Sequence, residues 1–354
     1  MKANSLKSYW SAIILFGFIG QFAWNIENMY FNTFLYNYIG GTTNDIANMV
    51  SLSALTATIT TLFIGALSDK INQRKIFISI GTILWGLSVL AFAFISRENV
   101  SLVLKNASVL EVTSISVTLV ILLDCIMTFF GSGSNDSAFN SWITDITDDT
   151  NRAKVEGVLS CFPLVGMLVV VGSAGLLIDL LGYPKFFILI GAIVSACGVL
   201  GLFIIKESKS GITSDVNYLS TVVHGFKVQV IKENNILYFL FLAIALFNIS
   251  VQIFMPYLII YLEKYLHFTA LEYSAALAFG VLISSIIGII LGSKIDKYGR
   301  NKFIPIAFSL YILGLIAVFI FKSFIIMLCL FPIVLTGFVL INILLNSSIR
   351  KYTP

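Results

Sequence analysis

One short charged motif occurs twice in this sequence, each time between two hydrophobic runs. The first copy is Gly65-Ala-Leu-Ser-Asp69-Lys70-Ile-Asn72-Gln-Arg74-Lys75, and the second is Gly292-Ser-Lys-Ile-Asp296-Lys297-Tyr-Gly299-Arg300-Asn-Lys302. A glycine, an aspartate and two lysines fall at the same offsets in both copies. Repetition of a charged turn at matching places among apolar segments is the signature of a duplicated bundle.

The composition places this bundle in a membrane. The chain is 58% hydrophobic and 11% charged, whereas a soluble domain has about 25% charged residues. The net charge of +4 does not indicate nucleic-acid binding, because the basic residues lie in short loops, where they set topology. All four cysteines lie inside apolar runs, so we expect neither disulfides nor a metal site. No cofactor is expected either.

Ten apolar runs are long enough to cross a bilayer, since a membrane helix needs ~20 mostly apolar residues. We therefore predict an all-α integral membrane protein with ten transmembrane helices, two short of twelve. The predicted spans are 9–38, 46–66, 76–96, 117–142, 154–181, 184–205, 235–262, 271–292, 303–321 and 324–346.

The distribution of basic residues predicts the orientation. With the N-terminus in the cytoplasm, 17 of the 22 Lys and Arg residues fall in cytoplasmic segments and five in outer ones. Because cytoplasmic loops are enriched in Lys and Arg, we predict a cytoplasmic N-terminus. Both motif copies and the loop 206–234 would then also be cytoplasmic. We expect a multi-pass protein of the cell membrane that acts as a monomer.

The two parts of the chain match beyond the charged motif. Trp24-Asn25-Ile26 pairs with Phe247-Asn248-Ile249, and Asn140-Ser-Trp-Ile143 pairs with Asn346-Ser-Ser-Ile349. Such a repeat is typical of a transporter with two related six-helix halves. We predict an N-terminal half at 1–205, a cytoplasmic linker at 206–234 and an incomplete C-terminal half of four helices at 235–354. A truncated chain is the expectation, and a natural ten-helix protein is the alternative.

The duplicated motif resembles the charged turn between helices 2 and 3, and between helices 8 and 9, of major facilitator superfamily transporters. The first copy departs from the family pattern, because Asn72 stands where glycine is usual. The resemblance implies a helical bundle that works by alternating access. It also implies an inner gate, for which the candidate residues are Gly65, Asp69, Arg74, Lys75, Gly292, Asp296, Arg300 and Lys302.

The first predicted helix carries the strongest candidates for solute binding. Gln21, Asn25, Asn28 and Asn32 share a narrow stripe at 100° per residue, and such a stripe suits hydrogen bonds to the hydroxyl groups of a polar solute. Trp24 lies beside it. Glu27 lies about 100° off the stripe, facing either a cation site or a partner on a neighbouring helix. A polar contact between helices is the alternative interpretation of the whole stripe.

Two further acids lie in the fourth helix, and the seventh helix adds polar residues. An ionisable group within a span is a functional candidate by default, so Glu27, Asp136 and Asp124 are the candidates for cation coupling. For Asp136 a structural contact is the alternative interpretation. Asn248 and Gln252 lie close together on the seventh helix, where Pro256 predicts a kink. They complete the predicted solute-binding set.

The surroundings of Glu27 and the segment from Asn140 to Gly157 are similar to bacterial cation-coupled sugar transporters, the glycoside–pentoside–hexuronide branch and its relatives. The second helix lacks the acid pair of the melibiose carriers, which favours coupling to H⁺, or to no ion at all, over coupling to Na⁺. We therefore predict a symporter for a sugar or glycoside. The alternatives are a drug or other-solute efflux member of the superfamily and a non-transporting fragment. No nucleophile motif, metal-ligand spacing or phosphate loop is present, so we do not expect an enzyme.

Overall fold

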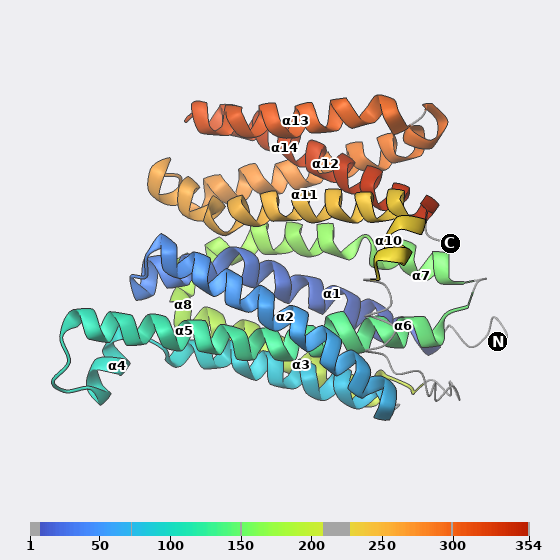
Figure 1. Cartoon of the computed structure of the whole chain (residues 1–354). Helices are drawn as coiled ribbons and strands as arrows, with labels where there is room; N and C mark the ends of the chain where they lie inside the picture. Colours follow the sequence, from blue (N-terminus) through green and yellow to red (C-terminus); the bar gives the residue numbers. More distant parts are fainter. Residues whose placement is uncertain (1–7, 72, 149–150, 208–226, 299, 353–354) are drawn as a thin grey trace. The chain divides into compact units, whose positions relative to one another are not determined.

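The computed structural model describes residues 8–71, 73–148, 151–207, 227–298 and 300–352, and every regular element within these ranges is a helix (Figure 1). The predicted all-helical fold is confirmed.

Two compact units are present. The first comprises Met1–Gly166 and Leu177–Asp215, and the second comprises Met167–Leu176 and Val216–Pro354. The predicted boundaries around the linker 206–234 fall largely outside the described residues and stay a prediction.

The first helix of the first unit is not a uniform α-helix. Helix α1 (Trp10–Ile26) runs into two π-helical segments, η2 (Glu27–Phe31) and η3 (Phe34–Ile39). The segment ends at Gly40, whose φ of 84° is a conformation that glycine adopts without steric cost. Because a π turn holds more residues than an α turn, the side chains after Ile26 depart from a straight α-helical stripe.

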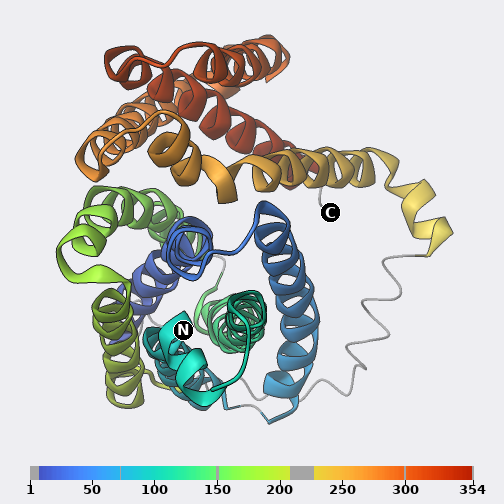
Figure 2. The same ribbon diagram turned by 90° about the vertical axis from the view of Figure 1, so that its left-hand side faces the viewer.

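The next helices of the first unit pack around α5. Helix α2 (Thr43–Ile71) leads to α3 (Arg74–Ala91), η4 (Phe92–Phe94) and the short α4 (Arg97–Val103). Helix α5 (Val109–Gly131) continues as η5 (Ser132–Phe139) and α6 (Asn140–Ile146). It packs against both α2 and α3, and Figure 2 gives an end view of these helices.

A capping box sets the start of α5. The Ser108 hydroxyl accepts a hydrogen bond from the Glu111 backbone N–H at 3.3 Å, and the Glu111 carboxylate accepts one from the Ser108 N–H at 2.7 Å. These two bonds satisfy donors that a helix N-terminus leaves free. The helix therefore begins at Val109 and extends beyond the apolar run predicted to start at 117.

Two predicted spans form one long element. After α7 (Arg152–Leu159), α8 (Phe162–Ile204) has 43 residues, and an unbroken helix of that length would be about 65 Å long. The backbone leaves helical geometry at Gly182, where φ is 73° and ψ is 162°, and Pro184 follows. Proline lacks the backbone N–H that a continuing helix would use. The break lies between the predicted spans 154–181 and 184–205.

From Lys227 onward, the described part of the second unit forms four long helices and a short one. They are α10 (Val228–Glu233), α11 (Asn235–Ile260) with its π-helical end η6 (Tyr261–Tyr265), α12 (Ala270–Tyr298), α13 (Arg300–Ile320) and α14 (Phe324–Tyr352). Helix α14 packs on α11, α12 and α13.

Eight helical stretches of the described chain are long and apolar enough to cross a membrane. The longest, Lys154–Ile204, has 51 residues and contains the break at Gly182. Helix α1 has only 17 residues before its π-helical continuation. Large apolar side chains are widely exposed, for example Phe203 at 78% and Ile289 at 77%. A surface of this kind suits contact with lipid rather than with water.

Glycines bring α3 and the second part of α8 into close contact. A Cβ on Gly191 would lie 2.5 Å from the Gly86 carbonyl oxygen, and one on Gly198 would lie 2.6 Å from the Ile83 nitrogen. Small residues at such an interface let two membrane helices approach at backbone distance. The face of α3 that receives α8 includes Ser79, Ile83, Gly86 and Leu90.

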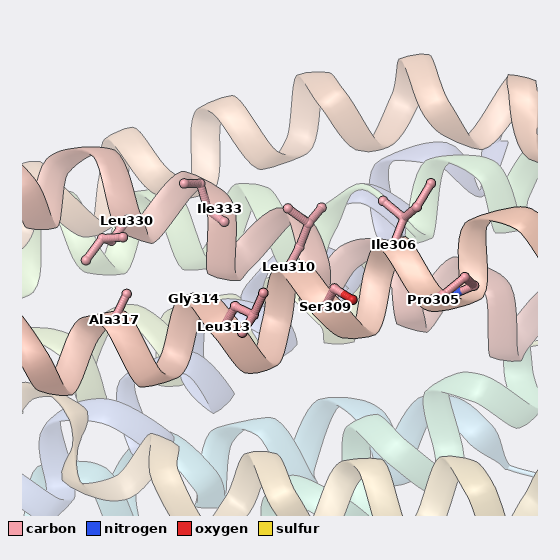
Figure 3. A pocket seen from close by; sticks show the side chains of 9 residues that line it. All are labelled: Pro305, Ile306, Ser309, Leu310, Leu313, Gly314, Ala317, Leu330 and Ile333. Atoms are coloured by element: carbon pink, nitrogen blue, oxygen red, sulfur yellow. The ribbon is translucent and has the colours of Figure 1, made fainter.

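Helix α13 of the second unit corresponds to α3 of the first, because each follows one copy of the charged motif. An open groove of about 540 Å³ lies between α13 and α14 (Figure 3). In the register set by the two motif copies, the positions that correspond to the α3 face are Ile306, Leu310, Leu313 and Ala317, and all four line the groove. Ser309 is its one polar lining residue. The groove thus marks the face that a helix covers in the first unit, and its apolar lining does not suit a polar solute.

Candidate functional site

The three asparagine amides of the predicted stripe are bonded to the helix that carries them. The side-chain nitrogen of Asn25 donates to the Gln21 carbonyl at 2.7 Å, that of Asn28 to the Trp24 carbonyl at 2.9 Å, and that of Asn32 to the Asn28 carbonyl at 2.9 Å. Because a carbonyl can only accept, each amide must turn its NH₂ group toward the backbone. Each therefore leaves its Oδ1 as an acceptor.

Exposure differs along this stripe. Asn28 is exposed, Gln21 and Asn25 are half-buried, and Asn32 is only 2% exposed. The Asn32 Oδ1 is buried without a hydrogen-bond partner. The π-helical segment that begins at Glu27 separates Asn28 and Asn32 from the α-helical register of Gln21 and Asn25. The exposed acceptor of the stripe is therefore that of Asn28, with Asn25 half-buried, whereas Asn32 keeps its acceptor inside the unit.

Glu27 reaches two neighbouring helices. Its Oε1 accepts from the Ser53 hydroxyl on α2 at 3.2 Å and from the Thr128 hydroxyl on α5 at 3.1 Å. Its Oε2 is buried and has no hydrogen-bond partner. Of the two directions left open by the sequence, Glu27 therefore takes the one toward neighbouring helices, with one carboxylate oxygen still unused.

Asp124 belongs to the same cluster. It lies one helical turn before Thr128 on α5, is 2% exposed, and lies beside the Ser53 side chain. Its Oδ1 is buried without a hydrogen-bond partner. The Ser53 and Thr128 hydroxyl oxygens are themselves 2.6 Å apart. Three helices thus place two carboxylates and two hydroxyls together in the interior of the first unit.

Asp136 lies in the π-helical segment η5 and has different partners. Its carboxylate lies beside the side chains of Trp24 and Ser132, but the buried Ser132 hydroxyl forms no hydrogen bond. The Trp24 ring in turn packs against Trp85, with 5.0 Å between ring centroids. A Cβ on Gly20 would overlap the Asn135 amide, so this glycine permits the close approach of α1 and η5. Among the described residues, neither Asp136 nor the other two acids forms an ion pair.

The first copy of the charged motif forms contacts within its own unit. Arg74 Nε donates to Asp145 Oδ2 at 3.1 Å, and the guanidinium also reaches the Ser68 hydroxyl. The Lys75 backbone N–H donates to Glu207 at 2.9 Å. Gly65 is buried and Lys302 is exposed. The side chains of Asp69, Gly292, Asp296 and Arg300 lie outside the described part of the chain, so their predicted gating role stays a prediction.

Asn248 and Gln252 lie on α11 in the second unit, where both side chains are exposed. Pro256 is accommodated within α11, and the π-helical segment η6 follows it. The predicted place of these two residues in the solute site stays a prediction.

Sequence analysis missed Ser53 and Thr128. Serine and threonine are common in membrane helices, and nothing in their own segments distinguishes these two from their neighbours. Their significance comes from a contact between three helices. Across the described residues, no three His, Cys, Asp or Glu side chains come together as a metal-binding group.

Comparisons with known proteins agree with this architecture. A sequence profile described as Major Facilitator Superfamily matches residues 13–354. The fold is similar to the crystal structure of a bacterial homologue of the human lysosomal transporter Spinster, in an inward-facing and unoccupied conformation. That match has a TM-score of 0.68 at 12% identity and covers 99% of this chain and 79% of the other. No curated protein matches the sequence.

Proposed function

The chain belongs to the major facilitator superfamily, and from this premise we propose that it carries a small polar solute of the sugar or glycoside class together with a cation. Membership makes it a multi-pass membrane transporter that works by alternating access, rather than an enzyme. The solute and the coupling go beyond membership, and the polar interior of the first unit is what supports them.

The row of amide oxygens on the first span carries the proposal for the solute. The amide nitrogens of Asn25 and Asn28 are each bonded to a backbone carbonyl, which holds the amide in place and leaves its oxygen as an acceptor. A solute with many hydroxyl donors complements such a surface, and a sugar is of this kind. A lipophilic drug has few donors to offer, so the amide row favours the sugar over the efflux alternative.

Three interior carboxylates support cation coupling. Glu27, Asp124 and Asp136 lie within apolar helices, and none of them is paired with a basic side chain in the described structure. A charged group in such a place is costly and is retained where it has a function. A cation that binds there in one conformation and leaves in another would couple its own gradient to solute movement.

The proposal also includes the orientation of the protein in the membrane and a role for the charged motif in gating. The excess of Lys and Arg supports a cytoplasmic N-terminus in the cell membrane. The motif residues would hold the inner side closed, and the contacts of Arg74 show how one basic residue of the motif links helices. The proposed active form is a monomer.

Uptake by purified protein in liposomes tests the proposal. Radiolabelled sugars and glycosides are offered under an imposed H⁺ gradient, an imposed Na⁺ gradient or neither, with protein-free liposomes as the control. We expect competition among related sugars, and accumulation only with a gradient. Glu27→Gln or Asp136→Asn should abolish accumulation and spare solute exchange. Efflux of lipophilic compounds without any sugar uptake or binding would contradict the proposal.

A further inference from the structure

The cluster of Glu27, Ser53, Asp124 and Thr128 is rich in oxygen atoms and short of hydrogen atoms. Three hydrogen-bond contacts link its members: Ser53 and Thr128 each contact Glu27 Oε1, and the two hydroxyl oxygens contact each other. Asp124 lies beside Ser53. A hydroxyl has a single hydrogen to donate, and an ionised carboxylate has none. Two hydrogens therefore serve three contacts.

Two carboxylate oxygens of the cluster have no donor at all, which increases the shortage of hydrogen atoms. Glu27 Oε2 and Asp124 Oδ1 are buried and have no hydrogen-bond partner. Asp124 is 2% exposed, Thr128 1% and Ser53 9%, so bulk water does not supply the missing donors. A buried polar atom without a partner is destabilising, and for a charged group the cost is higher still. Protonation of one or both carboxyl groups would add donors, but Glu27 Oε2 and Asp124 Oδ1 would still have no partner within hydrogen-bond distance.

A bound metal cation resolves the shortage, because one ion coordinates several oxygens at once. We propose that these four side chains form a binding site for one dehydrated monovalent cation of the Na⁺ class. Carboxylate and hydroxyl oxygens are hard ligands, the type that hard cations prefer. Mg²⁺ gives up its water reluctantly and demands octahedral geometry, which a dry cluster with two hydroxyl ligands does not suit.

The place of the site fits this role. The ligands come from the π-helical segment η2, from the middle of α2 and from α5, and coupling ions in transporters bind near the middle of the membrane. The absence of a carboxylate on α2 does not exclude Na⁺, because Ser53 supplies a hydroxyl there and Glu27 and Asp124 bring the charge. The purpose of the site rests on the proposed transport function, but its existence can be tested without transport.

Equilibrium binding of radiolabelled Na⁺ to the purified full chain in detergent tests the site, with choline chloride keeping the ionic strength constant. We expect saturable binding that unlabelled Li⁺ displaces. Glu27→Gln and Asp124→Asn should each weaken it by about a hundredfold or more, and Ser53→Ala and Thr128→Val by about tenfold.

Matched controls separate loss of the site from general damage. Ser116→Ala on α5 and Thr82→Val on α3 remove buried hydroxyls that donate only to carbonyls of their own helices, and both should bind Na⁺ like the parent. Each variant is compared as a single symmetric peak in gel filtration. If a carboxylate variant aggregates, the hydroxyl variants decide.

Each result has one meaning. Absence of saturable Na⁺ or Li⁺ binding by the parent overturns the site, even if the protein takes up sugar under an H⁺ gradient. Tighter binding of Ca²⁺ or Mg²⁺ than of Na⁺ overturns the monovalent assignment. Full Na⁺ binding in Thr128→Val and Asp124→Asn overturns the site itself. Specific Na⁺ binding without any solute uptake would support the site and contradict the proposed function instead.

Discussion

Arg74 and Asp145 form an ion pair that ties the first residue of α3 to the end of α6, with 3.1 Å between Arg74 Nε and Asp145 Oδ2. The Arg74 side chain is 8% exposed and the Asp145 side chain 21%. The same guanidinium contacts Ser68 near the end of α2. One arginine of the duplicated motif thus joins three helices of the first unit.

Removing the acid takes away the carboxylate that Arg74 Nε contacts in a largely buried place. We expect Asp145→Asn to lower the free energy of unfolding by about 1–3 kcal/mol, less than for a fully buried pair because Asp145 is partly exposed. Thermal unfolding of the purified protein in detergent measures the change. Glu156→Gln, which removes an exposed acid on the neighbouring α7, is the control and should unfold like the parent. Equal melting of both variants would mean that the pair does not stabilise the unit.

Apolar runs were sufficient to predict the helices, because a segment that crosses a bilayer must be long, apolar and internally hydrogen-bonded. Their ends were less predictable. The start of α5 depends on the bonds between Ser108 and Glu111, which hydropathy does not register. The π-helical segment from Glu27 to Phe31 was also not predictable from a regular 100° periodicity.

Only the charged residues of the candidate site could be predicted from the sequence. Glu27, Asp124 and Asp136 are conspicuous because acids are rare in apolar helices. Ser53 and Thr128 are 75 residues apart, and their contact depends on how α2 packs against α5. A single sequence contains no direct signal for that pairing. The neighbours of Asp136 depend on packing in the same way, since Trp24 comes from another helix.

The glycine contact between α3 and α8 gives a second prediction about stability. A Cβ on Gly191 would lie 2.5 Å from the Gly86 carbonyl oxygen, which belongs to the backbone and cannot move aside cheaply. Gly191→Leu should therefore separate the helices and lower the melting temperature and the yield of folded protein. Gly172→Leu on the same helix is the matched control, because a Cβ there meets no atom within 4 Å. Similar losses in both variants would point to a general intolerance of leucine in α8.

The predicted orientation leads to a labelling experiment. In a background without the four native cysteines, single cysteines are placed at Asn44, Ser108 and Lys302, which are all exposed. An impermeant thiol reagent added to intact cells should label the first two positions, and the third should react only after the membrane is opened. Basic residues set this orientation by remaining in the cytoplasm. Labelling of Lys302→Cys but not of Ser108→Cys in intact cells would reverse the assignment.

Asn28 offers the most direct test of the amide row. It is exposed, and its nitrogen is bonded to the Trp24 carbonyl, so its oxygen is free to accept from a solute hydroxyl. Asn28→Ala removes that acceptor without changing any charge. Loss of one neutral hydrogen bond costs about 0.5–1.5 kcal/mol, so the KM for the solute should rise about two- to tenfold at an unchanged melting temperature.

Asn140→Ala is the matched control. Asn140 is also exposed, and its nitrogen is bonded to a carbonyl four residues earlier, that of Asp136, but it lies outside the row. A rise in KM for Asn140→Ala alone would place the solute near the start of α6, whereas unchanged kinetics in both variants would remove Asn28 from the solute site.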